Sequence, residues 1–388
     1  MPSISPVRIR ITPVAERAVR DGHPWVYADA VRETSREGAA GDIAAIYDRK
    51  DRLLALGLFD PLSPIRVRVV HRGKPRPVDA EFWRERLREA VARRKGILDA
   101  QTTACRLVHG ESDGFPAFVV DRYAETLVAK VYSDVWKPRI GVLVDLLREE
   151  LTPQRIVLRR SRAMSGDGAE VVFGSAPEGE VDFLETGLRF GADVLKGQKT
   201  GFFLDQRENR RIVETLARGR ETLNAFSYSG GFSLYAARGG ATRVIDLDES
   251  PHALEAANRN FARNPGLATP HETVQADAFD WLGKTERLFD LVVLDPPSFA
   301  KRETERERAI GAYRRLAALG AARLRPGGIL VACSCSAHVC AEEFFGAVRE
   351  ALQRAGRPWT ELRTTRHPLD HPAGFREAEY LKGLYVRL

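Results

Sequence analysis

Residues 222–233 read Thr222-Leu-Asn-Ala-Phe-Ser-Tyr-Ser-Gly-Gly-Phe-Ser233, a predicted β-strand that enters a glycine turn and then a helix. Strand and helix signals alternate from this point to the C-terminus. We expect strands at 222–226, 243–248, 273–276, 291–295 and 329–334, with helices at 232–238, 251–264, 303–324 and 341–355. This alternation predicts an α/β fold, a doubly wound parallel sheet whose ligands bind beyond the carboxyl ends of its strands.

The N-terminal half of the chain has a different pattern. Residues 1–75 contain short predicted strands separated by turns, as in a small β-barrel, at 3–11, 43–47, 53–59 and 65–71. A linker near residues 73–77 leads to an amphipathic helix at 79–98, then to short strands, a helix at 137–151 and a strand at 184–190. We therefore expect a barrel at 1–75, a central α+β module at 76–190 and the α/β domain at 191–388.

The composition excludes several classes of protein. The 388 residues include no run of about 18 apolar residues, so a membrane-spanning protein is not expected. The N-terminus lacks the apolar block of a secretory signal. Four cysteines are too few for a disulfide scaffold in a chain of this size, which predicts a reducing, cytoplasmic location.

Positive charge is concentrated in one stretch of the sequence. The formal net charge is +7, and residues 65–95 contain eleven Lys or Arg against four Asp or Glu. Such a basic belt attracts polyanions by neutralising phosphates. Arg84 and Arg88 are its candidate RNA contacts, although the same i,i+4 spacing with Glu85 and Glu89 also fits an ordinary solvated helix face.

Acidic residues follow two of the predicted strands beside the glycine turn. Gly230 lies where the backbone must approach a ligand, Asp248 ends the second strand and can accept ribose hydroxyls, and Asp277 follows the third and suits an adenine amino group. A tight structural turn is the alternative for the glycines. The chain has neither a G-x-G-x-x-G after the strand nor a Walker motif to bind phosphates. The residues therefore predict an adenosine cofactor without phosphate, S-adenosylmethionine.

The fourth predicted strand ends in Asp295-Pro-Pro-Ser-Phe299. The carboxylate falls at the open edge of the sheet, and the two prolines stiffen the loop that follows. Loops of this kind grip a planar base in methyltransferases, and the alternative is a purely structural turn.

Cysteines end the fifth predicted strand. Carbon 5 of a pyrimidine accepts a methyl group only after a nucleophile adds to carbon 6, and a thiolate suits that step. Cys333 and Cys335 fall on the same side of the strand, so alternation does not separate them, but the position at the strand end favours Cys335. We expect Cys333 and Cys340 to be buried small residues. A zinc cluster including His338 is the other alternative, with an unusual spacing, and no metal is expected.

Together these motifs resemble one known family. Gly197-Gln-Lys-Thr-Gly-Phe-Phe-Leu-Asp-Gln-Arg207, the glycine turn, Asp295-Pro-Pro and Cys333-Ser-Cys335 are similar to motifs of the bacterial 23S rRNA 5-methylcytosine methyltransferases with an N-terminal PUA domain. The likeness extends over nearly the whole chain, including His23-Pro-Trp-Val-Tyr27. It implies a Rossmann-like class I methyltransferase domain preceded by a PUA-like barrel and the central module.

The resemblance also implies a role for each matching residue. Cys335 would be the nucleophile, and Asp295 would stabilise the base near N3 and lie beside the cofactor. The other residues implied to bind the cofactor are Phe203, Gln206, Ser227, Tyr228, Gly230, Asp248 and Asp277. Those implied to contact the substrate are Asp205, Arg207, Pro296, Pro297 and Phe299.

We therefore predict methylation of carbon 5 of a cytosine in 23S rRNA with S-adenosylmethionine as the cofactor. A purine-nitrogen methyltransferase and a non-catalytic RNA-binding assembly factor are the alternatives. The expected partner is ribosomal RNA, either naked or within a precursor of the large subunit. The sequence leaves open a homodimer and the identity of the modified nucleotide.

Overall fold

The computed structural model describes residues 5–161, 164 and 168–388, which form two compact units. The first unit comprises residues 1–183, 192–202 and 369–375, and the second comprises 184–191, 203–368 and 376–388. The expected barrel (1–75) and the expected central module (76–190), apart from residues 184–190, belong to the first unit. The chain passes from one unit to the other several times, and the short segments 184–191, 192–202 and 369–375 alternate between the two.

The N-terminal part of the first unit is a six-stranded sheet in the order β2-β6-β5-β4-β1-β3. Strands β4 and β5 have the bounds that the sequence predicts, whereas β1 begins at Val7 and the short helix α1, β2 and β3 were not predicted. Thr12 caps α1, accepting a hydrogen bond from the Ala15 backbone. The elements are β1 Val7–Ile11, α1 Pro13–Arg20, β2 Trp25–Tyr27, β3 Val31–Thr34, β4 Ile43–Tyr47, β5 Leu53–Phe59 and β6 Ile65–Arg72.

The second part of the first unit is a five-stranded sheet, ordered β11-β10-β9-β8-β7, with two helices packed against it. Buried Trp83 and Trp136, whose ring centroids are 4.9 Å apart, lie at the centre of its core. Helix α2 begins after its cap Asp79, as expected, but ends five residues early, before a turn at Gly96. The elements are α2 Ala80–Arg93, β7 Ala104–His109, β8 Phe118–Tyr123, β9 Thr126–Val131, α3 Ile140–Leu151, β10 Arg155–Arg160 and β11 Gly168–Phe173.

The strand expected at 184–190 is wrong. Two strands, β12 Val181–Glu185 and β13 Leu188–Ala192, pair as a hairpin. Thr186 and Gly187 both have positive φ (49° and 87°) and form the turn. A two-residue turn with positive φ at both positions joins antiparallel strands, and Thr-Gly is a weaker signal for it than Asn-Gly.

The second unit is built on a seven-stranded sheet in the order β16-β15-β14-β17-β18-β20-β19. Its first five strands are parallel, as predicted, and β20, which was not predicted, is antiparallel to both of its neighbours. The strands are β14 Glu221–Ala225, β15 Arg243–Asp248, β16 His271–Gln275, β17 Phe289–Leu294, β18 Leu324–Ser334, β19 Thr360–Thr365 and β20 Lys382–Arg387.

The reversal of β20 follows from the connection before it. Between β19 and β20 the only helical element described is the short 3-10 turn Arg376–Ala378. Parallel neighbours are usually joined by an α-helical crossover, whereas the described connection at residues 366–381 contains no α-helix. The result is the strand order of class I methyltransferases, in which one antiparallel strand is inserted near the edge of the doubly wound sheet.

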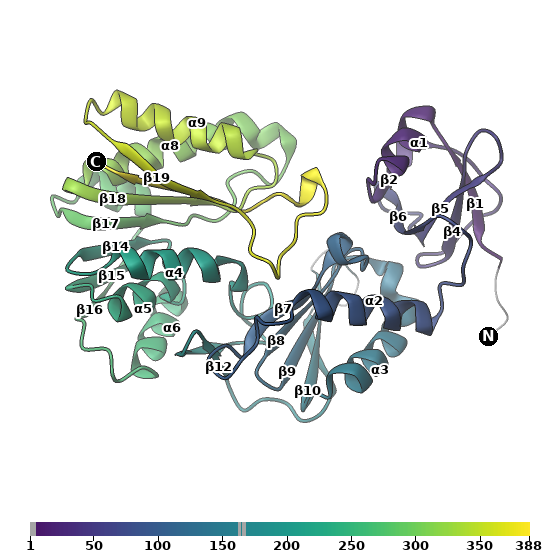
Figure 1. The fold of residues 1–388 in the computed structure, drawn as a ribbon, viewed down its shortest axis with the longest axis horizontal. Helices are drawn as coiled ribbons and strands as arrows, with labels where there is room; N and C mark the ends of the chain where they lie inside the picture. Colours follow the sequence, from purple (N-terminus) through teal and green to yellow (C-terminus); the bar gives the residue numbers. More distant parts are fainter. Residues whose placement is uncertain (1–4, 162–163, 165–167) are drawn as a thin grey trace. The chain divides into compact units, whose positions relative to one another are not determined.

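Helices cover both faces of this sheet (Figure 1). Val292 and Leu294 of β17 point into the core beneath α7, α8 and α9, and Leu291 and Val293 point into the core beneath α4 and α5. This alternation explains why β17 is apolar throughout. The helices are α4 Arg207–Leu216, α5 Gly231–Arg238, α6 Pro251–Ala262, α7 Ala278–Lys284, α8 Arg306–Ala322 and α9 Ala341–Arg354.

Candidate active site

Five parallel strands end at one edge of the sheet, and predicted site residues stand at each end. Because β14 to β18 run in the same direction, their carboxyl ends meet there. The residues at these ends are Ser227, Tyr228 and Gly230 after β14, Asp248 at the end of β15, Asp277 after β16, Asp295 after β17 and Cys335 after β18. The structure thus brings the cofactor and catalytic candidates of the α/β domain to one edge.

The turn after β14 is strained. Phe226, Tyr228 and Gly230 all have positive φ (61°, 47° and 74°), a conformation that only glycine adopts at little cost. A Cβ on Gly230 would also lie 2.9 Å from Oδ2 of Asp246 and 3.0 Å from Cβ of Ala257. Close packing against Asp246 and Ala257 therefore requires glycine at position 230. The sequence had suggested a different reason, namely the close approach of a ligand.

Asp246 is a site residue that the sequence analysis missed. It is fully buried, and its Oδ1 accepts hydrogen bonds from Asn224 Nδ2 (2.9 Å) and Ser233 Oγ (2.6 Å). Its Oδ2 lies 2.8 Å from His271 Nε2. This network joins β14, α5, β15 and β16 under the glycine turn. An Asp two residues before the strand end, in an otherwise apolar strand, is the signal that could have indicated it.

The two predicted nucleoside-binding acids are held by backbone amides. Asp248 Oδ2 accepts from the Tyr228 amide and Oδ1 from the Ser250 amide, both at 2.9 Å. Asp277 caps α7 through a 2.9 Å hydrogen bond from the Asp280 amide. Asp248 is half-buried and Asp277 is exposed, and the backbone hydrogen bonds hold each carboxylate at the sheet edge.

Buried polar atoms beside the glycine turn fit a bound polar ligand. Among the described residues, Ser227 Oγ and Asn224 Oδ1 are buried without a hydrogen-bond partner. Leaving such a group unsatisfied costs about 1–3 kcal/mol, which a ligand with hydrogen-bonding groups can recover. The rings of Phe203 and Tyr228 meet edge to face beside the turn, with centroids 5.0 Å apart. The donor set at this edge therefore suits S-adenosylmethionine.

A buried hydrogen-bond chain holds Asp295. Gln206 Nε2 donates to Asp295 Oδ1 at 2.8 Å, and Gln206 Oε1 accepts from Asn209 Nδ2 at 2.5 Å. Tyr385 of β20 donates to Asn209 Oδ1 at 3.0 Å. Gln206 was expected at the cofactor, and the structure shows it bound to the catalytic candidate. Asn209 and Tyr385 were not predicted, because no local motif links α4 to β20.

The Asp295-Pro-Pro loop lies against the end of β18. The Cys335 thiol donates to the Pro296 carbonyl with an S···O distance of 3.7 Å. Ser298 Oγ donates to Ser336 Oγ at 3.1 Å, and Ser334 Oγ donates to Tyr313 at 2.9 Å. These contacts fix the sulfur of Cys335 beside the loop that follows Asp295.

The cysteines of this region differ in exposure. Cys333 is 1% exposed and packs in the core beneath α4 and α5, and burial raises the pKa of its thiol. Cys335, one residue past the end of β18, is partly exposed. The expectation that Cys340 is buried is wrong, since Cys340 is partly exposed and is the N-cap of α9. In the described part of the chain, no three His, Cys, Asp or Glu residues are grouped to hold a metal ion.

Lys382 is a buried cation that the sequence analysis did not single out. It pairs with Ser334 across β18 and β20 and is 1% exposed. Its Nζ donates to the carbonyls of Ser336 and Val339, the latter at 2.6 Å, in the loop that follows Cys335. Burial lowers the pKa of Lys382 to about 8, and the charges of Cys335 and Cys340 oppose this shift.

The residues predicted to contact the substrate differ from one another in burial. Asp205 and Arg207 are buried, and Asp205 accepts a 2.9 Å hydrogen bond from Tyr380. Phe299 packs between the rings of Phe279 and Tyr313. Within the proline pair, Pro296 is buried and Pro297 is exposed.

Arg84 and Arg88 belong to α2 of the first unit and are already paired. Arg84 binds Glu149 and Glu150 of α3 at 2.9 and 2.7 Å, and Arg88 binds Glu150 at 2.8 Å. Hydrogen bonds from Arg88 and then Arg84 lower the pKa of Glu150, so this carboxylate stays charged and offsets both arginines. Their predicted contact with RNA is untested.

The sheet order and the convergence of these residues define a class I S-adenosylmethionine-dependent methyltransferase. A model of the S-adenosylmethionine-dependent methyltransferase family matches residues 152–358, and a PUA-like domain model matches residues 9–72. A ribosomal RNA large subunit methyltransferase from Deinococcus radiodurans is 53% identical, over 98% of this chain and 97% of its own length. Ribosomal RNA large subunit methyltransferase I from Shewanella amazonensis is 36% identical, over 98% and 99%. The chain therefore belongs to the ribosomal RNA large subunit methyltransferase family, and its cofactor is S-adenosylmethionine.

Solved structures agree with this fold. A candidate SAM-dependent methyltransferase from Streptococcus mutans has a TM-score of 0.86 at 20% identity, covering 98% of this chain and all of that one. A second methyltransferase structure, complexed with SAH, has a TM-score of 0.87 at the same identity. Across the described residues no helix combines the length and apolar character needed to cross a membrane.

Proposed function

We propose that the chain methylates carbon 5 of a cytosine in the RNA of the large ribosomal subunit, with Cys335 as the nucleophile. The observation that carries this proposal is the position of one thiol. Cys335 is partly exposed, its sulfur is 3.7 Å from the Pro296 carbonyl, and it stands next to the loop that Asp295 begins. Cys333, two residues earlier, is packed in the core and cannot meet a substrate.

The chemistry requires this pairing of a thiol and a carboxyl group. The Cys335 thiolate bonds to carbon 6, and the electron pair of the 5,6 double bond makes carbon 5 nucleophilic. S-Adenosylmethionine would supply the electrophilic methyl group, so that carbon 5 bonds to the methyl carbon while S-adenosylhomocysteine is released. Loss of the carbon 5 proton to water and expulsion of the thiolate then restore the aromatic ring. Asp295, oriented by Gln206, stabilises the base near N3 during the addition.

The cofactor-binding roles follow the positions at the sheet edge. Asp248 accepts hydrogen bonds from the ribose hydroxyls, and Asp277 accepts one from the adenine amino group. Ser227 Oγ, buried without a partner among the described residues, hydrogen-bonds the methionyl part. Tyr228, Gly230 and Phe203 shape the wall of the site.

RNA is the substrate class because the curated relatives are named for it. Those relatives are ribosomal RNA large subunit methyltransferases and match this chain over 97% or more of their length. The PUA-like barrel and the basic residues of the first unit are consistent with a polyanionic partner. The RNA of this proposal is 23S rRNA, naked or in a precursor particle.

The experiment compares two alanine variants. Cys335→Ala should lower methyl transfer from labelled S-adenosylmethionine to unmodified 23S rRNA by roughly a thousandfold or more. Cofactor affinity measured by calorimetry should not change. Cys333→Ala, the matched control, should keep its rate within severalfold, with a loss of stability only. Full activity of the Cys335 variant would refute the assignment.

A trapping experiment tests the substrate atom independently of mutagenesis. RNA containing 5-fluorocytidine should form a stable covalent complex with the protein, because the fluorine at carbon 5 cannot leave as a proton does. Peptide mapping should locate the bond at Cys335. Nucleoside mass spectrometry that finds a methylated purine and no 5-methylcytidine would instead support the purine-nitrogen activity.

A further inference from the structure

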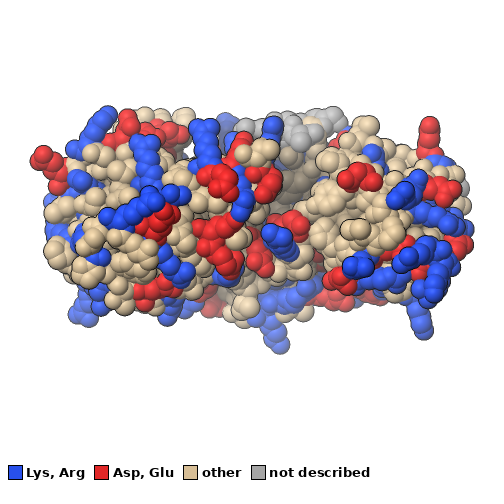
Figure 2. Space-filling view, turned by 90° about the horizontal axis from the view of Figure 1, so that it is seen from above, with Lys and Arg blue, Asp and Glu red and all other residues tan. Residues whose placement is uncertain are grey.

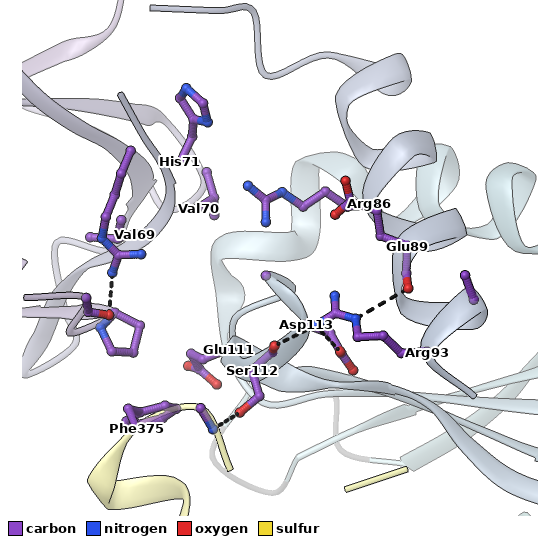
Figure 3. A pocket seen from close by; sticks show the side chains of 16 residues that line it. Val69, Val70, His71, Arg86, Glu89, Arg93, Glu111, Ser112, Asp113 and Phe375 are labelled. Atoms are coloured by element: carbon purple, nitrogen blue, oxygen red, sulfur yellow. Dashed lines mark hydrogen bonds and ion pairs between the residues drawn. The ribbon is translucent and has the colours of Figure 1, made fainter. Parts of the chain in front are cut away.

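A cavity of about 670 Å³ lies in the first unit, beside β6, α2 and the 3-10 turn Gly110–Asp113 (Figure 3). Three arginines and three acids line it: Arg72, Arg86, Arg93, Glu89, Glu111 and Asp113. The three positive and three negative side chains that line the cavity add up to no net charge. Which of these charges can act on a ligand depends on whether each side chain is already neutralised by a partner.

The negative charge of Glu111 is neutralised by a residue outside the cavity. Its Oε1 accepts from Trp25 Nε1 at 2.9 Å and from Arg68 Nη1 at 3.0 Å, and both carboxylate and guanidinium are largely buried. A buried carboxylate with a buried arginine partner offers little negative potential to a third group.

Asp113 is balanced in the same way. Both of its oxygens bind Arg94, one of them at 2.9 Å from Nη1, and the backbone amide of His109 donates at 2.7 Å. Arg93 adds a further contact at 3.3 Å. Asp113 is fully buried and its charge is consumed by these donors.

Arg72 and Arg86 have no carboxylate bonded to them in this way among the described residues. Arg72 donates to the neutral carbonyls of Val19 (3.0 Å), Gly22 (2.7 Å) and His23 (2.8 Å), which fix its guanidinium. Arg86 rests 4.9 Å from the ring centroid of Phe82 and extends from α2 into the cavity (Figure 3). In the described part of the chain, neither guanidinium pairs with a carboxylate.

Electrostatics makes this arrangement costly without an anion. Burial lowers the pKa of Arg72, and the charge of Arg86 lowers it further. Burial also lowers the pKa of Arg86, where the charges of Arg76 and Arg93 act against the favourable charges of Glu89 and Glu85. Arg72 is exposed and Arg86 is half-buried, and because their charges repel each other, an anion shared by both guanidinium groups would relieve this repulsion.

The face drawn in Figure 2 does not provide a single basic field. Figure 2 shows lysines and arginines mixed with aspartates and glutamates over the face that it draws. On α2, Arg84 and Arg88 turn toward α3 and its glutamates.

We propose that the cavity binds a phosphodiester of the substrate RNA between Arg72 and Arg86. The inference rests on the proposed function only in taking RNA as the substrate. Guanidinium groups match phosphate oxygens in geometry and charge. The volume exceeds that of a phosphate, so the attached sugar and base have room in the cavity.

Binding of unmodified 23S rRNA at several KCl concentrations tests the proposal. Arg86→Gln should weaken binding roughly fivefold to tenfold at 0.1 M salt and reduce the slope of log K against log salt by about 1. Arg148→Gln removes the same charge from α3, beside Asp145, and is the matched control with unchanged binding. Glu89→Gln should strengthen binding, because it removes the acid nearest Arg86 in the cavity wall.

Three results would overturn the proposal. Arg86→Gln could bind RNA like the wild type, or Arg88→Gln could weaken binding as much as Arg86→Gln does. Inorganic phosphate could protect Arg86 from modification by phenylglyoxal while RNA gives no protection, which would make the cavity a small-anion site. Methylation kinetics separate this proposal from the chemistry, since Arg86→Gln should raise KM for RNA and leave kcat unchanged whichever base is methylated.

Discussion

Gln206 Nε2 donates a 2.8 Å hydrogen bond to Asp295 Oδ1, and so links the start of α4 to the loop beside Cys335. The same side chain accepts from Asn209, so its amide can present only one orientation to the carboxylate. The carboxylate is thus fixed before any substrate arrives. Preorganised groups of this kind contribute to the rate, because they need no rearrangement in the transition state.

Gln206→Leu should therefore reduce kcat by roughly tenfold to a hundredfold. It should also cost about 1–3 kcal/mol in the free energy of unfolding, because Asn209 and Asp295 lose a buried partner. Single-turnover methylation and urea denaturation measure the two effects. Gln275→Leu, at an exposed position on the edge strand β16, is the control. Equal losses in the two variants would show that Gln206 has no positioning role.

The sequence could predict the strand ends because their cause is local. Asp248, Asp295 and Cys335 each follow an apolar run, and parallel strands bring such residues to one edge. The hydrogen-bond chain through Asn209 and Tyr385 could not be predicted, because it joins residues separated by 176 positions. Its existence depends on the insertion of β20 between β18 and β19, which no local pattern signals.

The basic belt shows a second limit of sequence reasoning. Arg84 and Arg88 have the spacing of a basic helix face, and both are paired with glutamates of α3, Glu149 and Glu150. Arg86, between them in sequence, points to the other side of the helix and into a cavity. A helical repeat identifies which residues share a face, and only tertiary packing decides what that face meets.

Lys382 should make stability depend on pH. Its pKa is about 8 in the folded chain, against 10.5 for a lysine exposed to water. Between these values the unfolded chain binds more protons, so the free energy of unfolding rises with pH; below pH 8 the full cost of the buried charge is present. The free energy of unfolding of the wild type, measured relative to that of Lys382→Met, should therefore rise by on the order of 2–3 kcal/mol between pH 7.5 and pH 10.5.

Urea denaturation of both proteins at several pH values measures this difference. A constant difference between pH 7.5 and 10.5 would contradict the prediction. Lys284→Met, at an exposed lysine of α7, reports the effect of the substitution itself. Lys382→Met should also slow methylation, because the loop carbonyls of Ser336 and Val339 beside Cys335 lose their donor.

The buried ion pair between Arg210 and Glu185 should be important for stability. Arg210 Nε and Nη2 donate to the two oxygens of Glu185 at 2.7 and 2.8 Å, and both side chains are at most 3% exposed. Glu185→Gln leaves a buried guanidinium without a counter-charge, which should cost about 3–5 kcal/mol. Glu361→Gln breaks an exposed pair with Arg349 of similar length and should cost less than about 1 kcal/mol. Similar costs measured by urea denaturation would contradict this distinction.

Gly230 should tolerate no larger residue. Gly230→Ala places a Cβ at φ 74°, 2.9 Å from Asp246 Oδ2, so the turn or the aspartate must move. We expect a loss of at least about 1–2 kcal/mol in stability and a weaker affinity for S-adenosylmethionine in calorimetry. Gly311→Ala is the matched control, because Gly311 lies within α8 and a Cβ there meets no atom within 4 Å. That variant should gain about 0.5–1 kcal/mol and bind the cofactor normally, since alanine favours the helix. Normal cofactor binding by Gly230→Ala would place the cofactor away from this turn.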